Sequence, residues 1–308
     1  MTSVIQMTKN PFILLSAALC LLFLSTPFLS STADGAGEFS GYVAAEADLF
    51  AHGPSHPGQK EHAASISIRP EYYREWNGGD RSLTFAPYLR VDSADTERTH
   101  FDIRELFWYS VREKYELGIG LRQVFWGVTE SQHLVDIVNQ TDAVDSLDGE
   151  EKLGAPMVSL SVPLDSTSIG DLGTIDIYLL PWFRERTFVG KKGRLRGATP
   201  VDTDQTEYES GAKEHNIDIA LRWSRSIGDY EIGLSYFTGT ARTPSFRTGT
   251  DAEGDTVYIP RYVQIDQAGL EAQKVHGDWS LKLEAIARSG QGDVYGAWTG
   301  GFEYTMVA

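Results

Sequence analysis

The 308-residue sequence has a single cysteine, Cys20, and few basic residues, 27 against 43 acidic ones. A lone cysteine excludes an internal disulfide and a cysteine-rich metal site. The formal net charge of −16 disfavours nucleic acid and anionic surfaces as partners. After residue 29 the sequence also lacks a long apolar run and a helical periodicity, so the remainder of the chain does not read as helical.

Residues 1–33 have the pattern of a signal peptide. Lys9 supplies a positive start, residues 12–29 are almost wholly apolar, and Ser31 and Ala33 place small residues where a signal peptidase cuts. About 18 apolar residues could instead anchor the chain in a bilayer, but Pro27 and the small residues after it favour cleavage. Cleavage would remove Lys9 and Cys20, leaving 26 basic and 43 acidic residues and a net charge of −17. We therefore predict a signal peptide over 1–33 and one domain over 34–308.

Alternation with a period of two residues runs through that domain. In residues 117–122, Leu117, Ile119 and Leu121 point one way, whereas Gly118, Gly120 and Arg122 point the other. Such a strand separates two different environments. In a soluble sandwich the apolar side faces a core, and in an outer-membrane barrel it faces lipid while the polar side faces a wet lumen.

The alternation predicts twelve strands. Both faces of residues 100–111 are mixed, so no inward face is assigned there, and residues 258–275 are expected to form one strand with a bulge near Gln267 and Ala268. The predicted strands are 38–50, 64–76, 83–92, 100–111, 115–122, 158–162, 175–184, 217–223, 230–236, 258–275, 279–288 and 295–308.

The predicted connections alternate between short and long. The short ones are 76–81, 112–115, 165–173, 226–229 and 276–278, and between them lie 51–59, 93–99, 128–154, 187–213, 241–256 and 289–293. Bacterial barrels have short periplasmic turns and longer external loops, whereas a soluble sandwich has no reason to sort its loops in this way. The alternation favours the barrel.

The polar side of these strands carries more charge than a packed core tolerates, and aromatic residues recur near the strand ends. We therefore predict an all-β, transmembrane, antiparallel up-and-down barrel. Its lumen would be lined by Arg69, Arg90, Arg122, Arg184, Arg222, Glu46, Asp92, Asp176, Asp218 and Glu284. Facing acids and bases would set up a transverse field for polar solutes, or would simply join the barrel walls as ion pairs.

The long insertion 128–154 is rich in acidic residues. It could be a solvated loop, or it could fold inward so that its side chains narrow the lumen as charged rings do in pores. The constriction residues would then be Glu130, His133, Asp136, Asp142 and Asp145. A catalytic triad of Ser131, His133 and Asp136 is a further alternative, although residues so close in sequence seldom reach triad geometry.

Two external loops carry other clusters. Lys191, Lys192, Arg194 and Arg196 could bind lipopolysaccharide phosphates or draw in anionic solutes, or could only keep the loop soluble. His52, His56 and His62 lie near one another in sequence, but their spacing matches no standard metal site. No metal, cofactor or catalytic residue is predicted.

Residues 121–127 resemble porin-like outer-membrane proteins of Gram-negative bacteria. In some porin-like families a strand ends in Arg-Gln, an aromatic residue and Trp-Gly follow, and the next loop carries an Asp and an Asn-Pro. The matching positions are Arg122, Gln123, Trp126, Gly127, Asp136 and Asn139, with Gln140 in place of the proline. The resemblance implies passage of small solutes and does not specify which.

The end of the chain departs from that family. Such barrels usually end on a strand with a terminal Phe or Trp, whereas this sequence ends Met306-Val307-Ala308. We therefore expect a fragment of a larger barrel of about fourteen to eighteen strands.

The leading hypothesis is an outer-membrane channel for passive or facilitated diffusion of small polar solutes, in contact with outer-membrane lipid and lipopolysaccharide. The sequence leaves open whether it forms a homo-oligomer. The alternatives are an outer-membrane hydrolase and a non-conducting adhesin or scaffold.

Overall fold

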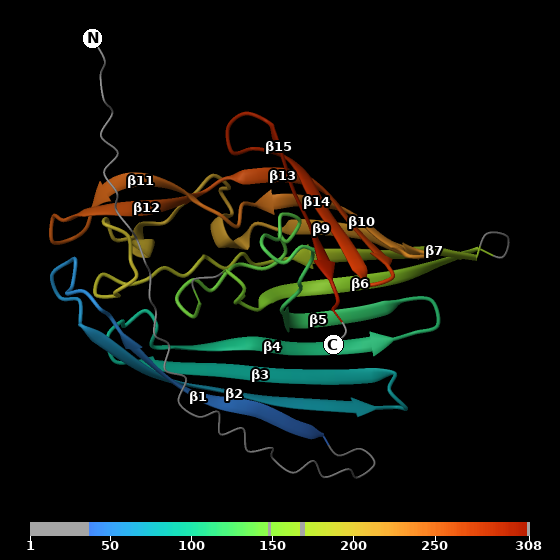
Figure 1. The fold of residues 1–308 in the computed structure, drawn as a ribbon, viewed down its shortest axis with the longest axis horizontal. Helices are drawn as coiled ribbons and strands as arrows, with labels where there is room; N and C mark the ends of the chain where they lie inside the picture. Colours follow the sequence, from blue (N-terminus) through green and yellow to red (C-terminus); the bar gives the residue numbers. More distant parts are fainter. Residues whose placement is uncertain (1–36, 147–148, 167–169, 307–308) are drawn as a thin grey trace.

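The computed structural model describes residues 37–146, 149–166 and 170–306. The predicted signal peptide, residues 1–33, lies outside the described residues. Twelve strands form one antiparallel sheet in which each strand pairs with the next strand of the same sheet along the chain (Figure 1), which confirms the prediction of an all-β fold of antiparallel strands. The strands are β1 (Glu38–Leu49), β2 (His62–Trp76), β3 (Arg81–Asp92), β4 (His100–Val111), β5 (Glu116–Arg122), β6 (Ala155–Ser166), β7 (Gly170–Leu180), β9 (Asp218–Ile227), β10 (Tyr230–Thr240), β13 (Gln264–His276), β14 (Trp279–Ser289) and β15 (Tyr295–Tyr304).

The two faces of the sheet have opposite chemistry and opposite exposure. On β2 the apolar residues Ile66 and Ile68 are 61% and 39% exposed, whereas Ser65 and Ser67 are each only 5% exposed. Large apolar side chains on the same face of β5, β10 and β14, such as Ile119, Leu234 and Leu281, are also exposed. A soluble domain buries its apolar face and exposes its hydroxyls, so this sheet has the reverse arrangement.

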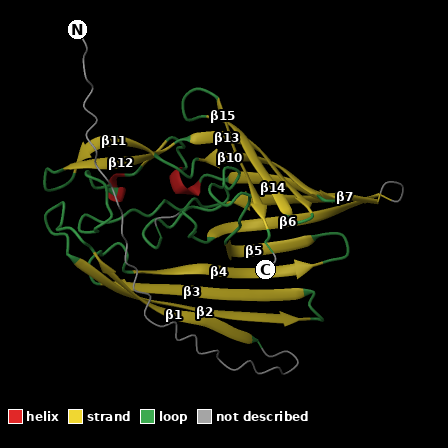
Figure 2. Ribbon diagram, in the orientation of Figure 1, coloured by secondary structure: helices red, strands yellow, loops and turns green. Residues whose placement is uncertain are grey.

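Connections at the two ends of the strands differ in length, as predicted. Tight turns join β2 to β3 and β9 to β10, and Asn77 and Gly78 take the positive φ values, 57° and 71°, that a turn of this kind demands. The longer connections gather toward the other end, with most of the loops drawn on the left of Figure 2. One of these, residues 123–154 between β5 and β6, we call the inner loop.

The inner loop shows that the sheet is curled. Its Asp145 forms an ion pair with Arg90 on β3, and its Thr129 hydrogen-bonds to Glu284 on β14. Because β3 and β14 lie near opposite edges of the sheet, the sheet must wrap around the loop to reach both. We call the face toward the loop the inner face. Within the described residues no pairing joins β1 to β15, so both are edge strands there.

A β-bulge explains why the inward face of residues 100–111 could not be assigned. Ala86 pairs with Glu105 and Pro87 pairs with Ile103, so Arg104 has no partner residue on β3. Asp102 before the bulge, the bulged Arg104 itself and Phe107 after it are all buried. The extra residue shifts the alternation by one position, which is why neither face reads as uniform.

A second sheet corrects the prediction for residues 258–275. These residues do not form one bulged strand, because β12 (Thr256–Tyr262) leaves the main sheet and pairs with β11 (Ser245–Thr250) and β8 (Glu207–Tyr208). Only β13 belongs to the main sheet. The predicted insertions 187–213 and 241–256 therefore contain short strands. Two 3-10 helices, η1 (Thr203–Gln205) and η2 (Lys213–His215), lie in the same region, and no described helix has the length and apolar composition needed to cross a membrane.

The strand predicted over 175–184 ends earlier than expected. β7 stops at Leu180, so Phe183 and Arg184 lie in the connection that follows rather than in the sheet. Phe183 is buried there against Tyr262 of β12, with ring centroids 4.8 Å apart. This aromatic packing joins the second sheet to the end of the main one.

Candidate passage and inner loop

The neck of the inner loop is closed by one side chain, Asn139. Its amide nitrogen donates to the carbonyl oxygens of Arg122 and Leu153, both at 2.8 Å, and its oxygen accepts from the Val124 amide at 2.8 Å. These bonds tie the last residue of β5 to the segment that leads into β6. Asn139, singled out in the sequence by the Trp-Gly motif, thus holds the two ends of the loop together.

The Trp126-Gly127 pair fixes how the loop enters the interior. Trp126 is buried and meets Tyr178 of β7 edge-on, with ring centroids 5.8 Å apart. Gly127 has a φ of 112°, and a Cβ there would lie 2.6 Å from a carboxylate oxygen of Glu284. A larger residue would therefore have to displace that carboxylate.

An apolar core forms where the inner loop packs on the inner face. Val135, Ile137 and Val138 of the loop are almost fully buried. They belong to one cluster with residues of seven strands, namely Phe107, Ala155, Met157, Leu180, Ala220, Phe237, Ile265 and Ile286, together with Trp126 and Ala241. The inner loop is therefore a packed part of the fold and not a solvated excursion.

On β13 and β14, carboxylates of the sheet hold the loop by its backbone. Glu284 is fully buried, and one of its oxygens accepts from the amides of Val128 and Thr129, both at 2.9 Å, and from the Thr129 hydroxyl at 2.6 Å. The other oxygen accepts from the Val135 amide at 3.2 Å. Glu271 accepts from the Gly127 amide at 3.0 Å and pairs with Arg222. We call Glu271 and Glu284 the acidic wall.

On β3 and β4 the polarity is reversed, because arginines of the sheet hold carboxylates of the loop. Arg104 is 1% exposed and lies 2.6 Å from Asp142 and 3.5 Å from Asp145. Arg90, also buried, pairs with Asp145 and with Glu46 of β1. We call Arg90 and Arg104 the basic wall.

The surroundings of Asp142 favour its charged form. Burial alone would raise the pKa of its carboxyl, but contacts with His100, Arg104 and Thr187 lower the pKa well below the ordinary 3.8. The Thr187 hydroxyl donates to Asp142 at 2.7 Å, and His100 Nε2 lies 3.5 Å from it. A buried carboxylate with this many partners anchors the loop only while it is charged.

Asp136 and Lys152 form a buried ion pair within the loop itself. Burial raises the pKa of Asp136 despite the nearby ammonium group, and burial lowers the pKa of Lys152. Both shifts have the sign expected when desolvation opposes charge.

The five predicted constriction residues thus fall into two groups. The side chains of Asp136, Asp142 and Asp145 are buried and paired with basic side chains, so none of them is a free charge. Glu130 is exposed and pairs with Lys282 of β14, and His133 Nε2 lies 3.3 Å from Glu150. A role for Glu130 and His133 in constriction stays a prediction.

A triad of Ser131, His133 and Asp136 does not assemble. Within the described part of the chain no side-chain hydrogen bond joins these three residues, because Asp136 is taken by Lys152 and His133 by Glu150. The hydrogen bonds that would link nucleophile to base and base to orienting carboxylate are therefore missing here.

The other predicted lining residues lie mostly in pairs. Arg222 binds Glu271, and Asp218 binds Arg242 at 2.7 Å. Glu46 and Asp92 are both bridged by Arg98, at 3.2 Å each. These contacts match the wall-joining alternative for the inward charges.

Two predicted lining residues have neutral partners, and a third lies outside the strands. Arg69 donates to Gln123 at 3.2 Å, and Arg122 lies over the Phe107 ring, 5.0 Å from its centroid. Arg184, in the connection after β7, reaches Asp102 at 2.8 Å. Asp176 of β7 pairs in register with Arg222.

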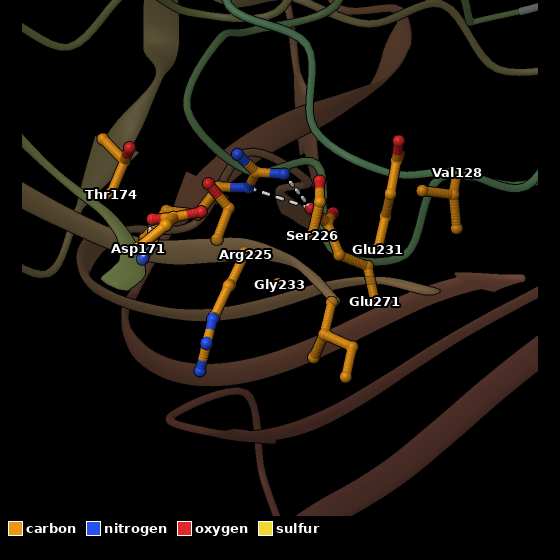
Figure 3. A pocket seen from close by; sticks show the side chains of 12 residues that line it. Val128, Asp171, Thr174, Arg225, Ser226, Glu231, Gly233 and Glu271 are labelled. Atoms are coloured by element: carbon orange, nitrogen blue, oxygen red, sulfur yellow. Dashed lines mark hydrogen bonds and ion pairs between the residues drawn. The ribbon is translucent and has the colours of Figure 1, made fainter. Parts of the chain in front are cut away.

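Two cavities lie on the two sides of the inner loop. A cavity of about 340 Å³ at the tight-turn end, the turn-side cavity, is lined by Val128 of the loop and by Asp171, Arg222, Glu231 and Glu271 (Figure 3). The dashed lines that end on Glu271 in Figure 3 mark its bonds to Arg222.

The second cavity, about 520 Å³, lies at the end with long loops and is lined on the loop by residues that include His133 and Asp136. Arg242, Arg288 and Tyr295 contribute the opposite side of this loop-side cavity. Because Val128 lines one cavity and His133 the other, the segment between them runs from one polar space to the other. This arrangement is a candidate passage interrupted by a short piece of chain.

The external basic cluster is largely occupied by the chain itself. Lys191 pairs with Asp251 and Glu253, Arg194 donates to the carbonyl of Gly53 at 2.8 Å, and Arg196 donates to the carbonyl of Lys191 at 2.7 Å. The aliphatic stem of Lys192 lies close to Gly58, because its Cγ is 3.6 Å from the position that a Cβ on Gly58 would occupy. Binding of lipopolysaccharide phosphate at this cluster stays a prediction.

Several contacts could not be read from the sequence. Arg98 and Arg242 both lie in predicted loops and were not predicted as site residues. Arg98 bridges Glu46 and Asp92, and Arg242 donates to the carbonyls of Ile137 and Val138 of the inner loop, at 3.0 Å each. Arg98 lies two residues before β4 and Arg242 two residues after β10, so a charged residue close to a strand end was the available signal. Among the described residues no group of three or more His, Cys, Asp or Glu is placed to hold a metal ion.

Comparison with known proteins identifies no family for the chain. No family model matches it, and no curated protein matches it. Among solved structures it is similar to one described as the copper transporter OprC, at 10% identity and a TM-score of 0.35, over 85% of this chain and 44% of that chain. The chain thus spans less than half the length of that structure, and a likeness this distant carries no argument about function.

Proposed function

We propose that the protein is an outer-membrane β-barrel channel for the diffusion of small polar solutes. The observation that carries the proposal is the inverted sheet, in which isoleucines are exposed and serines and arginines are enclosed. In a bilayer the exposed apolar face meets lipid, and the enclosed face lines a wet interior. Gram-negative outer membranes hold sheets of this kind, so we place the protein there.

In this proposal the inner loop narrows the passage between the turn-side and loop-side cavities. Two walls of opposite charge hold it, so the segment 128–133 stays across the path instead of swinging out. The exposed Glu130, next to Lys282, is then the carboxylate that a passing ion meets. No chemical step is assigned to any residue, and the channel needs no cofactor.

Planar-bilayer recording of the folded, full-length chain tests the proposal. We expect discrete conductance steps, with a cation preference that falls in Glu130→Gln. Glu253→Gln is the matched control, because Glu253 is, like Glu130, an exposed acid paired with a lysine but belongs to the β11–β12 connection instead of the segment 128–133, and its selectivity should equal that of the parent. Bilayers that stay silent with folded protein would refute the channel, and loss of selectivity in both variants would refute the role of Glu130.

A further inference from the structure

An apolar cavity lies apart from the sheet, among the connections that carry the second sheet. It measures about 340 Å³ and is lined by Phe188, Val189, Leu195, Pro200, Val201 and Phe246, with Arg186 and Arg196 among the remaining lining residues. We call it the apolar cavity. Thr243 lines both this cavity and the loop-side cavity, so the two are neighbours.

The cavity is built from aromatic and aliphatic side chains in an exposed part of the chain. Phe188 and Phe246 meet edge to face, with ring centroids 5.7 Å apart. Phe246 and Leu195 are nevertheless 47% and 57% exposed. Connections at a strand end are normally polar, so open apolar side chains around a hollow of this size are typical of a binding site for an apolar group.

The charge at the cavity is positive in a chain whose net charge is −16. The guanidinium of Arg186 forms no hydrogen bond or ion pair with any residue in the described ranges; only its backbone amide is engaged, by the Tyr262 hydroxyl at 3.0 Å. The guanidinium of Arg196 donates to the carbonyls of Lys191, Gly197 and Ala198 and meets no carboxylate there. A partly buried arginine without an acid is suited to an anionic ligand.

We propose that the apolar cavity binds a small amphipathic monocarboxylate, with the apolar body between Phe188 and Phe246 and the carboxylate on Arg186. A cavity of this volume is at the lower end of the range for small-molecule sites, which suits a single ring or a short alkyl chain. The proposal is independent of conductance, because the cavity lies outside the path between the turn-side and loop-side cavities.

The test is isothermal titration of the full-length protein in detergent with phenylacetate. Two probes separate the contributions: acetate lacks the apolar body, and 2-phenylethanol lacks the charge. We expect phenylacetate to bind about tenfold or more tightly than 2-phenylethanol, because a hydrogen bond to a charged group contributes at least that factor. We expect a similar margin over acetate, because acetate lacks the apolar body that fills the cavity. Equal binding of phenylacetate and 2-phenylethanol would overturn the assignment of charge recognition.

Variants locate the site. Arg186→Gln should reduce phenylacetate binding to the level of 2-phenylethanol and leave 2-phenylethanol unchanged. Arg247→Gln is the matched control, because Arg247 pairs with Glu207 outside the cavity and should bind as the parent does.

Phe246→Ala and Leu195→Ala should each weaken both ring-containing probes. Leu195 lies outside the second sheet, so a loss in both variants cannot be due to unfolding of β11 alone. Full binding retained in Arg186→Gln, or in both apolar variants, would place the ligand elsewhere and overturn the proposal.

Discussion

The basic wall and the acidic wall hold the same loop by opposite means. At the basic wall, Arg90 and Arg104 of the sheet bind carboxylate side chains of the loop. At the acidic wall, Glu271 and Glu284 of the sheet bind backbone amides of the loop. The first anchorage depends on the loop's side chains, whereas the second depends mainly on its backbone conformation, with the Thr129 hydroxyl as the one side-chain donor described.

The difference has an energetic consequence. Removing one partner of a buried ion pair leaves an uncompensated charge, which costs about 3–5 kcal/mol. Removing an acceptor of amide hydrogen bonds leaves neutral groups unsatisfied, which costs about 1–3 kcal/mol each where water cannot reach. Damage to the basic wall should therefore destabilise the fold more than comparable damage to the acidic wall.

The largest effect is expected for Arg104→Met. This variant keeps the volume of the side chain but leaves Asp142 buried beside Asp102 without its nearest cation. We expect a loss of about 3–5 kcal/mol in the free energy of unfolding, measured by urea titration in lipid vesicles. Arg247→Gln, at an exposed pair, should cost at most about 1 kcal/mol. Similar losses in the two variants would mean that the basic wall is not a buried anchor.

A smaller effect is expected for Glu284→Gln. The amide keeps one acceptor oxygen for Val128 and Thr129, but its NH₂ group cannot accept from the Val135 amide. We expect a loss of about 1–3 kcal/mol. Hydrogen exchange should quicken over residues 127–135 and remain slow around Asp142, and Arg104→Met should show the reverse pattern. Uniform exchange along the loop in either variant would contradict two separate anchors.

The smallest effect is expected from acid. The folded-state pKa of Asp142 is lowered, so its contribution to stability is present above the ordinary carboxyl pKa of 3.8 and is lost as pH falls through the lower folded value. For Asp136 the pKa is raised, so its contribution is present below 3.8 and is lost as pH rises through the folded value. Between about pH 5 and pH 2, urea midpoints should fall less steeply in Asp142→Asn than in the parent and more steeply in Asp136→Asn. Parallel curves for the three proteins would contradict these assignments.

Much of the fold could be predicted because a strand has a strict period of two. Residues 64–68 read as alternating in the sequence and alternate in exposure in the structure. The prediction was incomplete where the period breaks without a sequence signal. Arg104 is an extra residue in its strand, and at Val263 the chain passes from the second sheet into the main sheet between two alternating runs that look continuous.

The site was less predictable, and the two walls show why. The sequence indicates inward arginines and loop carboxylates, but Arg104 and Asp142 are 38 residues apart, and only the folded chain matches them. The alternation predicts Glu284 on the polar face, but three of its partners are backbone amides, which every residue except proline has. No pattern of side chains can therefore mark them.

The central claim is that the apolar face meets hydrocarbon and the polar face encloses water. It is tested most directly by spin labels at single cysteines, in a Cys20→Ser background of the protein reconstituted in lipid vesicles. Labels at Ile66, Ile119 and Leu283 should be relaxed strongly by oxygen and weakly by a water-soluble nickel complex. Labels at Glu231 and His133 should show the opposite. If the labels at the three apolar positions are instead reached by the nickel complex, the sheet does not face lipid and the channel proposal is wrong.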